Sequence, residues 1–399
     1  MKTPLETRRH TVLVLFMICA VLAVLTMGKY AFELAQKDSL VSGDFPVFWQ
    51  AAQRVADGRM DQIYSPADLH TSLGDGQTAN YAFIYPPVFA SLLSLLALVP
   101  ANAAYLLWLL AVNGFFLLVM HRCYGRYGSA LHSTPDGRML YAMLLLATPI
   151  LCTALFTAQL SGLLAGLLLL GMHFSDRRPL LAGLAFGLMC IKPQYALLAA
   201  CAMLARGRWQ VIVVAVATAA LCAALATLHL GIERWSEWLA LVPQFMQAVY
   251  YEFPHQFVHL VVSPFYTLSL LMGMPYTASM AIQLVVSVLL LVVTLQVFRA
   301  TDSQREPLRM AWLLCASLLA SPHMFSYDLL LALLPVMVLL NRAWSNTGTL
   351  LLTGVLAVGV AMSPFMQALV SPSHFPFSLM VSTVLVACIY QIYRKERSQ

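Results

Sequence analysis

The sequence predicts an all-α polytopic membrane protein. Of its 399 residues, 60% are hydrophobic and 10% are charged, whereas an ordinary soluble domain has roughly 45–50% apolar and about 25% charged residues. The apolar residues form runs close to the length that a helix needs to cross a bilayer. The net charge of +6 comes from short basic clusters between these runs. Such clusters orient a membrane protein, and we therefore exclude nucleic acid as a partner.

The first apolar run, from Thr11 to Gly28, follows Arg8 and Arg9. It is about as long as a bilayer is thick, and no small-x-small cleavage site follows it in the sequence. We expect a retained span whose N-terminus is cytoplasmic.

Further apolar runs give an expected total of about 11 to 13 crossings. They lie near 82–99, 103–121, 139–156, 160–174, 180–191, 194–205, 210–230, 256–273, 276–298, 310–321, 329–340, 349–366 and 377–393. Full crossings at both 82–99 and 103–121 would place the arginine-containing 122–138 loop outside. One of the two is therefore re-entrant, or the positive-inside rule fails there. We expect 256–273 to be interfacial or re-entrant.

The distribution of acidic and basic residues predicts on which side of the membrane the segments between the apolar runs lie. We expect a single integral membrane domain over 1–399, with a first outer loop at 30–80 and a second outer or interfacial segment at 231–275. The first loop holds seven of the seventeen acids, and the second has tryptophans and tyrosines that suit the headgroup boundary. Cytoplasmic clusters are Lys2/Arg8/Arg9, Arg177/Arg178, Arg206/Arg208, Arg299/Arg305/Arg309 and Arg394/Lys395/Arg397.

Eight cysteines are scattered singly, with no Cys-x-x-Cys pair. The sequence therefore implies neither a metal site nor a disulfide framework.

Asp44 lies between a glycine and a run of aromatic residues. Over 45–57 the apolar residues recur at helical spacing, and Gly58 stands where a C-terminal cap would, which predicts a helix on the membrane surface. Asp44 precedes the first turn of this helix. A role as N-cap and a catalytic role are equally supported by these residues, and the two are compatible.

Lys192 is embedded between two apolar runs. Because an unpaired cation there is costly, such residues generally face a polar cavity. The flanking runs are too short for two ordinary spans, which predicts a broken hairpin between Arg178 and Arg206 with Lys192 near the outer side. We favour an anion ligand over a structural ion pair or a snorkelling side chain.

A second break is predicted at Ser321-Pro322-His323. His323 could donate to a phosphate, orient a hydroxyl, or only satisfy carbonyls that the break leaves free. Asp328 follows at the start of the next run, and we interpret it as a cap or as the partner of a buried cation rather than as a nucleophile. Gln159 similarly opens a span, and two prolines follow Tyr85, where missing amides are harmless.

In their order along the chain, these motifs resemble glycosyltransferase family 87. The motifs are Gly43-Asp44-Phe45 with Ala51-Ala52, Gly58 with Tyr64, Tyr85-Pro86-Pro87, Gln159 opening a span, Ile191-Lys192-Pro193, and Ser321-Pro322-His323 with Tyr327-Asp328. The resemblance runs from residue 12 to about 393. Family members often carry Gly-Gln and Asn-Gln-Ser where this chain has Ala158-Gln159 and His255-Gln256-Phe257.

The resemblance implies a GT-C-type glycosyltransferase fold with juxtamembrane helices on the outer face, multi-pass in the bacterial inner membrane. It implies an active site facing the periplasm or cell exterior, and transfer of a hexose, with mannose as the expected sugar. The donor is polyprenyl-phosphate-linked, and the acceptor is lipid-linked or a glycan. The general base is an aspartate of the first outer loop, which only Asp44 matches.

Donor-phosphate and substrate contacts are expected from residues in the same motifs and in the second outer segment. They are Lys192, His323, Tyr85, Gln159, Tyr327, Asp328, Gln256 and Tyr64. No cofactor or metal is expected, and the absence of an Asp-x-Asp sequence is consistent with a phospholipid donor. Because no second carboxylate is placed as a nucleophile, a single displacement would invert the anomeric centre.

Two alternatives remain open. A secondary transporter or flippase of a lipid-linked or anionic substrate would also use broken helices with a central lysine and aspartate. That class leaves the acidic, aromatic first loop unexplained, and no internal inverted repeat is detectable. A lipid-linked O-antigen ligase or polymerase is the other alternative, although those enzymes usually place their long outer loop late in the chain.

Overall fold

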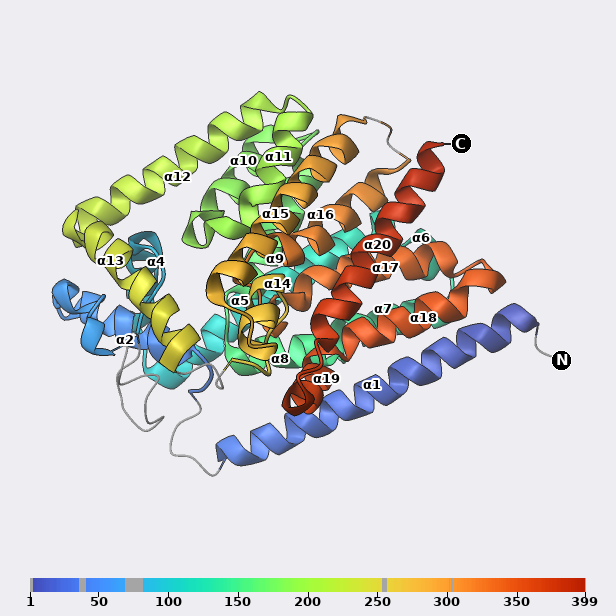
Figure 1. The fold of residues 1–399 in the computed structure, drawn as a ribbon, viewed down its shortest axis with the longest axis horizontal. Helices are drawn as coiled ribbons and strands as arrows, with labels where there is room; N and C mark the ends of the chain where they lie inside the picture. The colour runs from blue at the N-terminus through green and yellow to red at the C-terminus, as the bar shows by residue number, and fades with distance from the viewer. Residues whose placement is uncertain are drawn as a thin grey trace.

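The computed structural model describes residues 3–35, 41–68, 82–252, 257–300, 302 and 304–398, and this part is built from helices and turns (Figure 1). The first half contains α1 (Pro4–Ala35), α2 (Phe45–Ala56), η1 (Met60–Gln62), α4 (Pro87–Leu93), η2 (Ser94–Leu98), α5 (Ala101–Tyr127), α6 (Ser129–His132), α7 (Pro135–Leu146), α8 (Pro149–Thr157), α9 (Ser161–Phe174), α10 (Pro179–Leu188), η3 (Met189–Ile191), η4 (Pro193–Ala196) and α11 (Leu197–Ala205).

The second half continues the helical pattern. It contains α12 (Trp209–Leu230), α13 (Glu233–Gln247), η5 (Ala248–Glu252), α14 (Pro264–Tyr266), η7 (Thr267–Leu271), α15 (Tyr276–Arg299), α16 (Glu306–Ala320), η8 (Ser326–Ala332), α17 (Leu333–Ala343), α18 (Thr347–Ala361), α19 (Ser363–Val370), η9 (Ser371–Ser373) and α20 (Phe377–Arg397).

Seven helices of the described chain are long and apolar enough to cross a membrane, or eight if the bent pair α18 and α19–η9 counts as one span. The seven are α1, α5, α7–α8, α12, α15, η8–α17 and α20. The expected all-α polytopic architecture is confirmed. The expected total of about 11 to 13 crossings additionally requires shorter helices such as α9, α10 and α11, and it stays a prediction.

Neither of the two ambiguous segments contains a helix of spanning length within the described residues. The segment 82–99 holds only the short apolar helix Pro87–Leu98, whereas Ala101–Tyr127 is long enough to span. In 257–273 the backbone forms the short elements α14 and η7. The helix lengths favour one solution to the conflict over the 122–138 loop: α1 and α5 cross, the 82–99 segment does not, and the loop returns to the side of the N-terminus.

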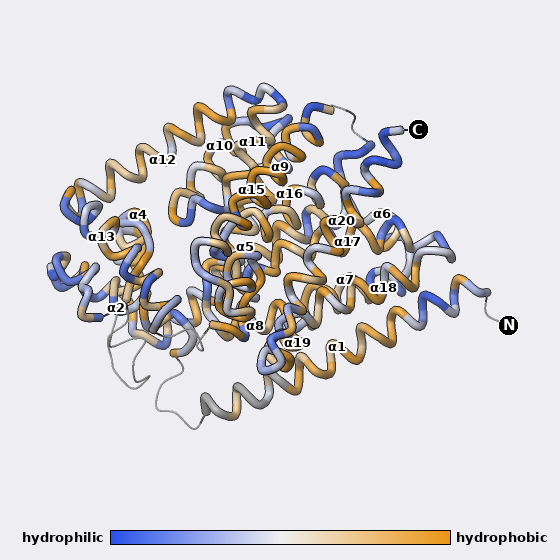
Figure 2. Tube along the Cα trace, in the orientation of Figure 1, coloured by the Kyte–Doolittle hydropathy of each residue, from blue (hydrophilic) through white to orange (hydrophobic). Residues whose placement is uncertain are grey.

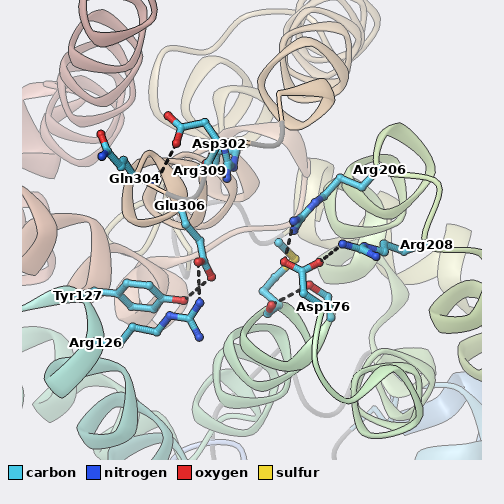
Figure 3. A network of polar contacts seen from close by, with 11 residues as sticks. Arg126, Tyr127, Asp176, Arg206, Arg208, Asp302, Gln304, Glu306 and Arg309 are labelled. Atoms are coloured by element: carbon cyan, nitrogen blue, oxygen red, sulfur yellow. Dashed lines mark hydrogen bonds and ion pairs between the residues drawn. The ribbon is translucent and has the colours of Figure 1, made fainter.

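The chain segments that carry the basic clusters lie toward the side of the molecule that holds both termini, which we call the terminal end (Figure 1). They are the start of α1, the turns between α11 and α12 and between α15 and α16, and the end of α20, and these segments are hydrophilic (Figure 2). Figure 3 shows part of this end: Asp176 pairs with Arg206 at 2.7 Å and with Arg208 at 2.5 Å. Arg126 pairs with Glu306 at 2.6 Å. The opposite end carries α2, α4 and α13. This polarity is the one that the positive-inside rule predicts for a terminal end in the cytoplasm.

Helix α16 and the η8–α17 segment form the centre of the bundle. From Leu308 to Ala320, and again from Ser326 to Leu340, every residue is buried. Neighbouring helices surround both segments, so a polar side chain here must find its partners inside the protein. Asp328 is such a side chain.

Candidate functional site

Breaks in the helical path meet at the end opposite the termini. They lie before α2 at Gly43, between α8 and α9 at Ala158, between η3 and η4 at Lys192, and between α16 and η8 near His323. A break in an apolar bundle frees backbone polar groups and attracts polar side chains. The broken hairpin expected around Lys192 is present, as α10 with η3 followed by η4 with α11.

These breaks surround a cavity of about 530 Å³. Six residues predicted from the sequence line it: Asp44, Tyr85, Gln159, Lys192, His323 and Tyr327. One wall is apolar and comes mainly from α13 and η5: Trp238, Val242, Phe245, Met246 and Val249. The cavity thus has polar side chains on one side and an apolar wall on the other, which is the combination that binds amphipathic ligands.

Gly43 allows the start of α2 to touch the end of α8. Its φ is +62°, and a Cβ there would lie 2.6 Å from the Thr157 carbonyl oxygen. The Asp44 amide donates to that same carbonyl at 2.9 Å. Only glycine combines this backbone conformation with such a close approach.

The next break uses a left-handed residue too. Ala158 has φ +49°, and its carbonyl accepts a hydrogen bond from the Trp108 indole at 2.8 Å. This reversal ends α8 and turns buried Gln159 toward Asp44.

Asp44 occupies the N-cap position of α2, but its side chain makes no capping hydrogen bond. Instead its Oδ2 accepts a hydrogen bond from Gln159 Nε2, and Gln159 Oε1 accepts one from the Tyr85 hydroxyl at 2.9 Å. The opposite amide orientation would turn Oε1 toward an ionised carboxylate, which is repulsive. Tyr85 is fixed in turn, since its carbonyl accepts from the Tyr64 hydroxyl at 2.8 Å.

The environment of Asp44 makes it a stronger base than an ordinary aspartate. Burial raises the pKa of its carboxyl from 3.8 to about 6, while the positive charge of Lys192 and the hydrogen bond from Gln159 act in the lowering direction. A carboxylate with this pKa is ionised at neutral pH and can still accept a proton.

Asp328 has a different environment and lies fully buried. Its Oδ1 accepts from the Ser161 hydroxyl at 2.6 Å and from the Tyr195 hydroxyl, and its Oδ2 accepts from the Phe325 amide at 2.9 Å. The last contact caps η8. These donors occupy the carboxylate and hold three breaks together.

Lys192 lies between Asp328 and the cavity. Its Nζ is 3.8 Å from Asp328 Oδ1, beyond hydrogen-bond distance, and 5.2 Å and 5.6 Å from the ring centroids of Tyr195 and Tyr327. One carboxylate and two aromatic faces therefore hold the ammonium. Within the described part of the chain Lys192 Nζ makes no direct hydrogen bond, so its donors remain available to a ligand.

His323 is neutral at pH 7. Burial, and secondly the charge of Lys192, lower the pKa of its imidazole to about 4. Its Nδ1 lies 3.0 Å from the Tyr266 hydroxyl. In the cavity His323 can therefore act as a neutral hydrogen-bonding group, but not as a cation.

The remaining predicted residues lie elsewhere. Asp328 is buried behind Lys192, and Tyr64 contacts Tyr85 from behind the cavity wall. Gln256 lies outside the described residues. The sequence analysis missed His259 and Tyr266, which also line the cavity. One signal in the sequence could have identified them: both lie in the 256–273 run, which was expected to be interfacial or re-entrant.

Comparison with known proteins gives one match. The family model described as glycosyltransferase family 87 matches residues 83–322, more than half of the chain. The matched range includes Tyr85, Gln159 and Lys192. No curated protein and no solved structure matches the chain.

The close approach at Gly43 can be tested by Gly43→Ala. We expect a loss of about 2–5 kcal/mol of stability, because a left-handed alanine costs about 1–2 kcal/mol and the backbone clash adds about 1–3 kcal/mol. The measurement is the melting temperature of the purified protein.

Gly58→Ala is the matched control. Gly58 also has a positive φ, of +72°, but a Cβ there would meet nothing within 4 Å. This variant should lose only the conformational part. Equal melting temperatures for the two variants would contradict the close approach.

Proposed function

Since the chain belongs to glycosyltransferase family 87, we propose that it transfers a hexose, with mannose as the expected sugar, from a polyprenyl-phosphate-linked donor. The acceptor is a lipid-linked or glycan hydroxyl. That the protein is a membrane glycosyltransferase follows from the family and from its apolar helices, and the all-α polytopic architecture is consistent with the GT-C type. The family also favours transfer over the transport that broken helices alone would allow.

The observation that carries the proposal is a carboxylate with a pKa of about 6 in the same cavity as a lysine without a direct hydrogen bond. In the proposed step Asp44 takes the proton of the acceptor hydroxyl as its oxygen attacks the anomeric carbon. The new carbon–oxygen bond forms while the bond to the phosphate oxygen breaks, and polyprenyl phosphate leaves with the electron pair. Because the attack and departure occur on opposite faces, the anomeric centre inverts.

The contacts of Asp328 support a single displacement. Two hydroxyls and one backbone amide already occupy its oxygens, so it is not placed to attack a sugar. Asp44 then has the role of base alone.

Lys192 is proposed to hold the departing phosphate. A compact ammonium with unused donors stabilises the charge that develops as polyprenyl phosphate leaves. His323 adds a neutral hydrogen bond, and Tyr327 shapes the cavity beside the lysine.

The apolar wall supports a lipid-linked donor. Val242, Phe245 and Met246 face the cavity from α13, and such a wall can accept the first isoprene units of a polyprenyl chain by burying their surface. A soluble nucleotide sugar has no apolar chain that could be buried against this wall.

The proposed orientation places the cavity outside. The catalytic cavity lies at the end away from the basic clusters and both termini, and the positive-inside rule assigns the basic end to the cytoplasm. In a bacterial inner membrane, Asp44 and the 231–275 segment would then face the periplasm.

Asp44→Asn tests the role of the base. We expect transfer to fall by roughly 10²–10⁴-fold, because an amide cannot accept the proton. Folding should survive, since the raised pKa shows that the folded protein tolerates an uncharged group here at least as well as a charged one. The assay is purified protein with polyprenyl-phosphate-mannose and candidate glycolipid acceptors.

Asp57→Asn is the control, because Asp57 is an exposed carboxylate just after the same helix, paired with Arg59 at 2.6 Å. It should keep wild-type turnover. Near wild-type turnover in Asp44→Asn would reduce Asp44 to a structural residue.

Lys192→Met tests the phosphate contact. A charge-assisted contact is worth about 1.5–3 kcal/mol, so donor use should weaken by roughly tenfold to hundredfold. Lys192→Arg should recover only part of this, since a planar fork does not replace a compact ammonium. The measurements are donor kinetics and melting temperature.

The double variant Lys192→Met/Asp328→Asn separates this role from a structural ion pair. In Lys192→Met, Asp328 still accepts hydrogen bonds from its three other donors and so remains stabilised. Replacing Asp328 as well should therefore restore no transfer. Unchanged donor kinetics in Lys192→Met, with a stability loss that the double variant rescues, would refute the phosphate contact.

A further inference from the structure

A second cavity lies at the terminal end, far from the catalytic cavity. Its volume is about 430 Å³, and it lies between the ends of α15 and α20. The Tyr393 hydroxyl donates to the Val297 carbonyl at 3.0 Å and joins the two helices there. The lining residues are Gln296, Val297, Tyr390, Tyr393, Arg394, Arg397 and Ser398.

Two arginines in this cavity lack the carboxylate partners that neighbouring arginines have. Within the described ranges, neither Arg394 nor Arg397 forms an ion pair. At the same end Arg342 pairs with Glu396, and Arg305 pairs with Asp302 at 2.7 Å. Figure 3 shows three further arginines with carboxylate partners: Arg206 and Arg208 pair with Asp176, and Arg126 pairs with Glu306. The cavity is therefore a site of uncompensated positive charge.

The lining can also supply hydrogen bonds of the right kind. Two guanidinium groups offer forked donors that match a phosphate group. The Gln296 amide and the Tyr390 hydroxyl can add neutral hydrogen bonds, which suits a phosphate with further polar substituents.

Exposed apolar stripes lead from the membrane to this cavity. On α15, Val285, Val288 and Val292 are exposed and recur at three- and four-residue spacing toward Gln296, which places them on one face. On α20, Met380 and Val384 are exposed and stand on the face that ends at Arg394. A molecule with a phosphate in the cavity could lay acyl chains along these stripes.

The geometry points to a binding site for the phosphate headgroup of an anionic phospholipid between the terminal ends of α15 and α20. The two arginines without a carboxylate partner favour an anion, and the apolar stripes favour a lipid over free phosphate. Basic pockets between membrane helices at the cytoplasmic surface bind anionic headgroups in this way. The site is separate from the transfer reaction and does not depend on it.

The test is lipid binding to the purified full chain, measured by native mass spectrometry and by melting temperature. The probes are phosphatidylglycerol, phosphatidylethanolamine and inorganic phosphate. Phosphatidylglycerol should bind and stabilise more than phosphatidylethanolamine, and inorganic phosphate should not displace it at equal concentration. The double variant Arg394→Gln/Arg397→Gln should bind phosphatidylglycerol roughly thirtyfold more weakly.

Lys395→Gln is the matched control for each single arginine variant, because it removes one positive charge from the same turn of α20 but does not line the cavity. It should bind like the wild type. Since Arg394 and Arg397 are exposed, their variants should fold, and the single variants should each lose about fivefold. Phosphatidylglycerol binding by each single arginine variant equal to that of Lys395→Gln would overturn the site. Complete displacement by inorganic phosphate would overturn its assignment to a lipid.

Discussion

The contact between Gly43 and the end of α8 is the constraint on which the proposed catalytic cavity depends. It brings α2, which lies outside the spanning helices, onto the break that begins α9. Asp44 and Gln159 are 115 residues apart in sequence, yet their side chains bond because Gly43 and Ala158 both adopt left-handed conformations. Tyr85 and Tyr64 then fix the amide from behind. The position of the proposed base is thus set by backbone geometry before any substrate binds.

The two carboxylates near Lys192 show how environment separates roles. Asp328 is surrounded by donors that stabilise its position and join three breaks, whereas Asp44 receives one side-chain hydrogen bond and faces the cavity. The cation stands close enough to both to influence them, since it lies 3.8 Å from Asp328 and its charge opposes the rise in the pKa of Asp44. In the proposed mechanism the first carboxylate therefore holds the structure together and the second acts as the base.

Sequence reasoning could find residues whose chemistry conflicts with their surroundings. Lys192 between apolar runs and Asp44 beside a glycine were visible for that reason, as were the surface helix ending before Gly58 and the broken hairpin. The bond from Gln159 to Asp44 could not be predicted, because it depends on tertiary contact between distant breaks. The lowered pKa of His323 could not be predicted from the sequence either, since it results from burial and from the charge of Lys192. The 82–99 run was ambiguous because its composition is that of a span, while its helices are too short to be one.

The pH dependence of transfer tests most directly the claim that Asp44 is a base tuned by its position beside Gln159. We predict a rate that falls about tenfold per pH unit below about pH 6 and levels off above about pH 7, because only the carboxylate form is active. In Gln159→Leu the midpoint should move to higher pH, since the lost hydrogen bond stabilises the carboxylate. The melting temperature recorded at each pH separates ionisation from unfolding. A rate that does not change between about pH 5 and about pH 7, or a midpoint that Gln159→Leu leaves in place, would contradict the account.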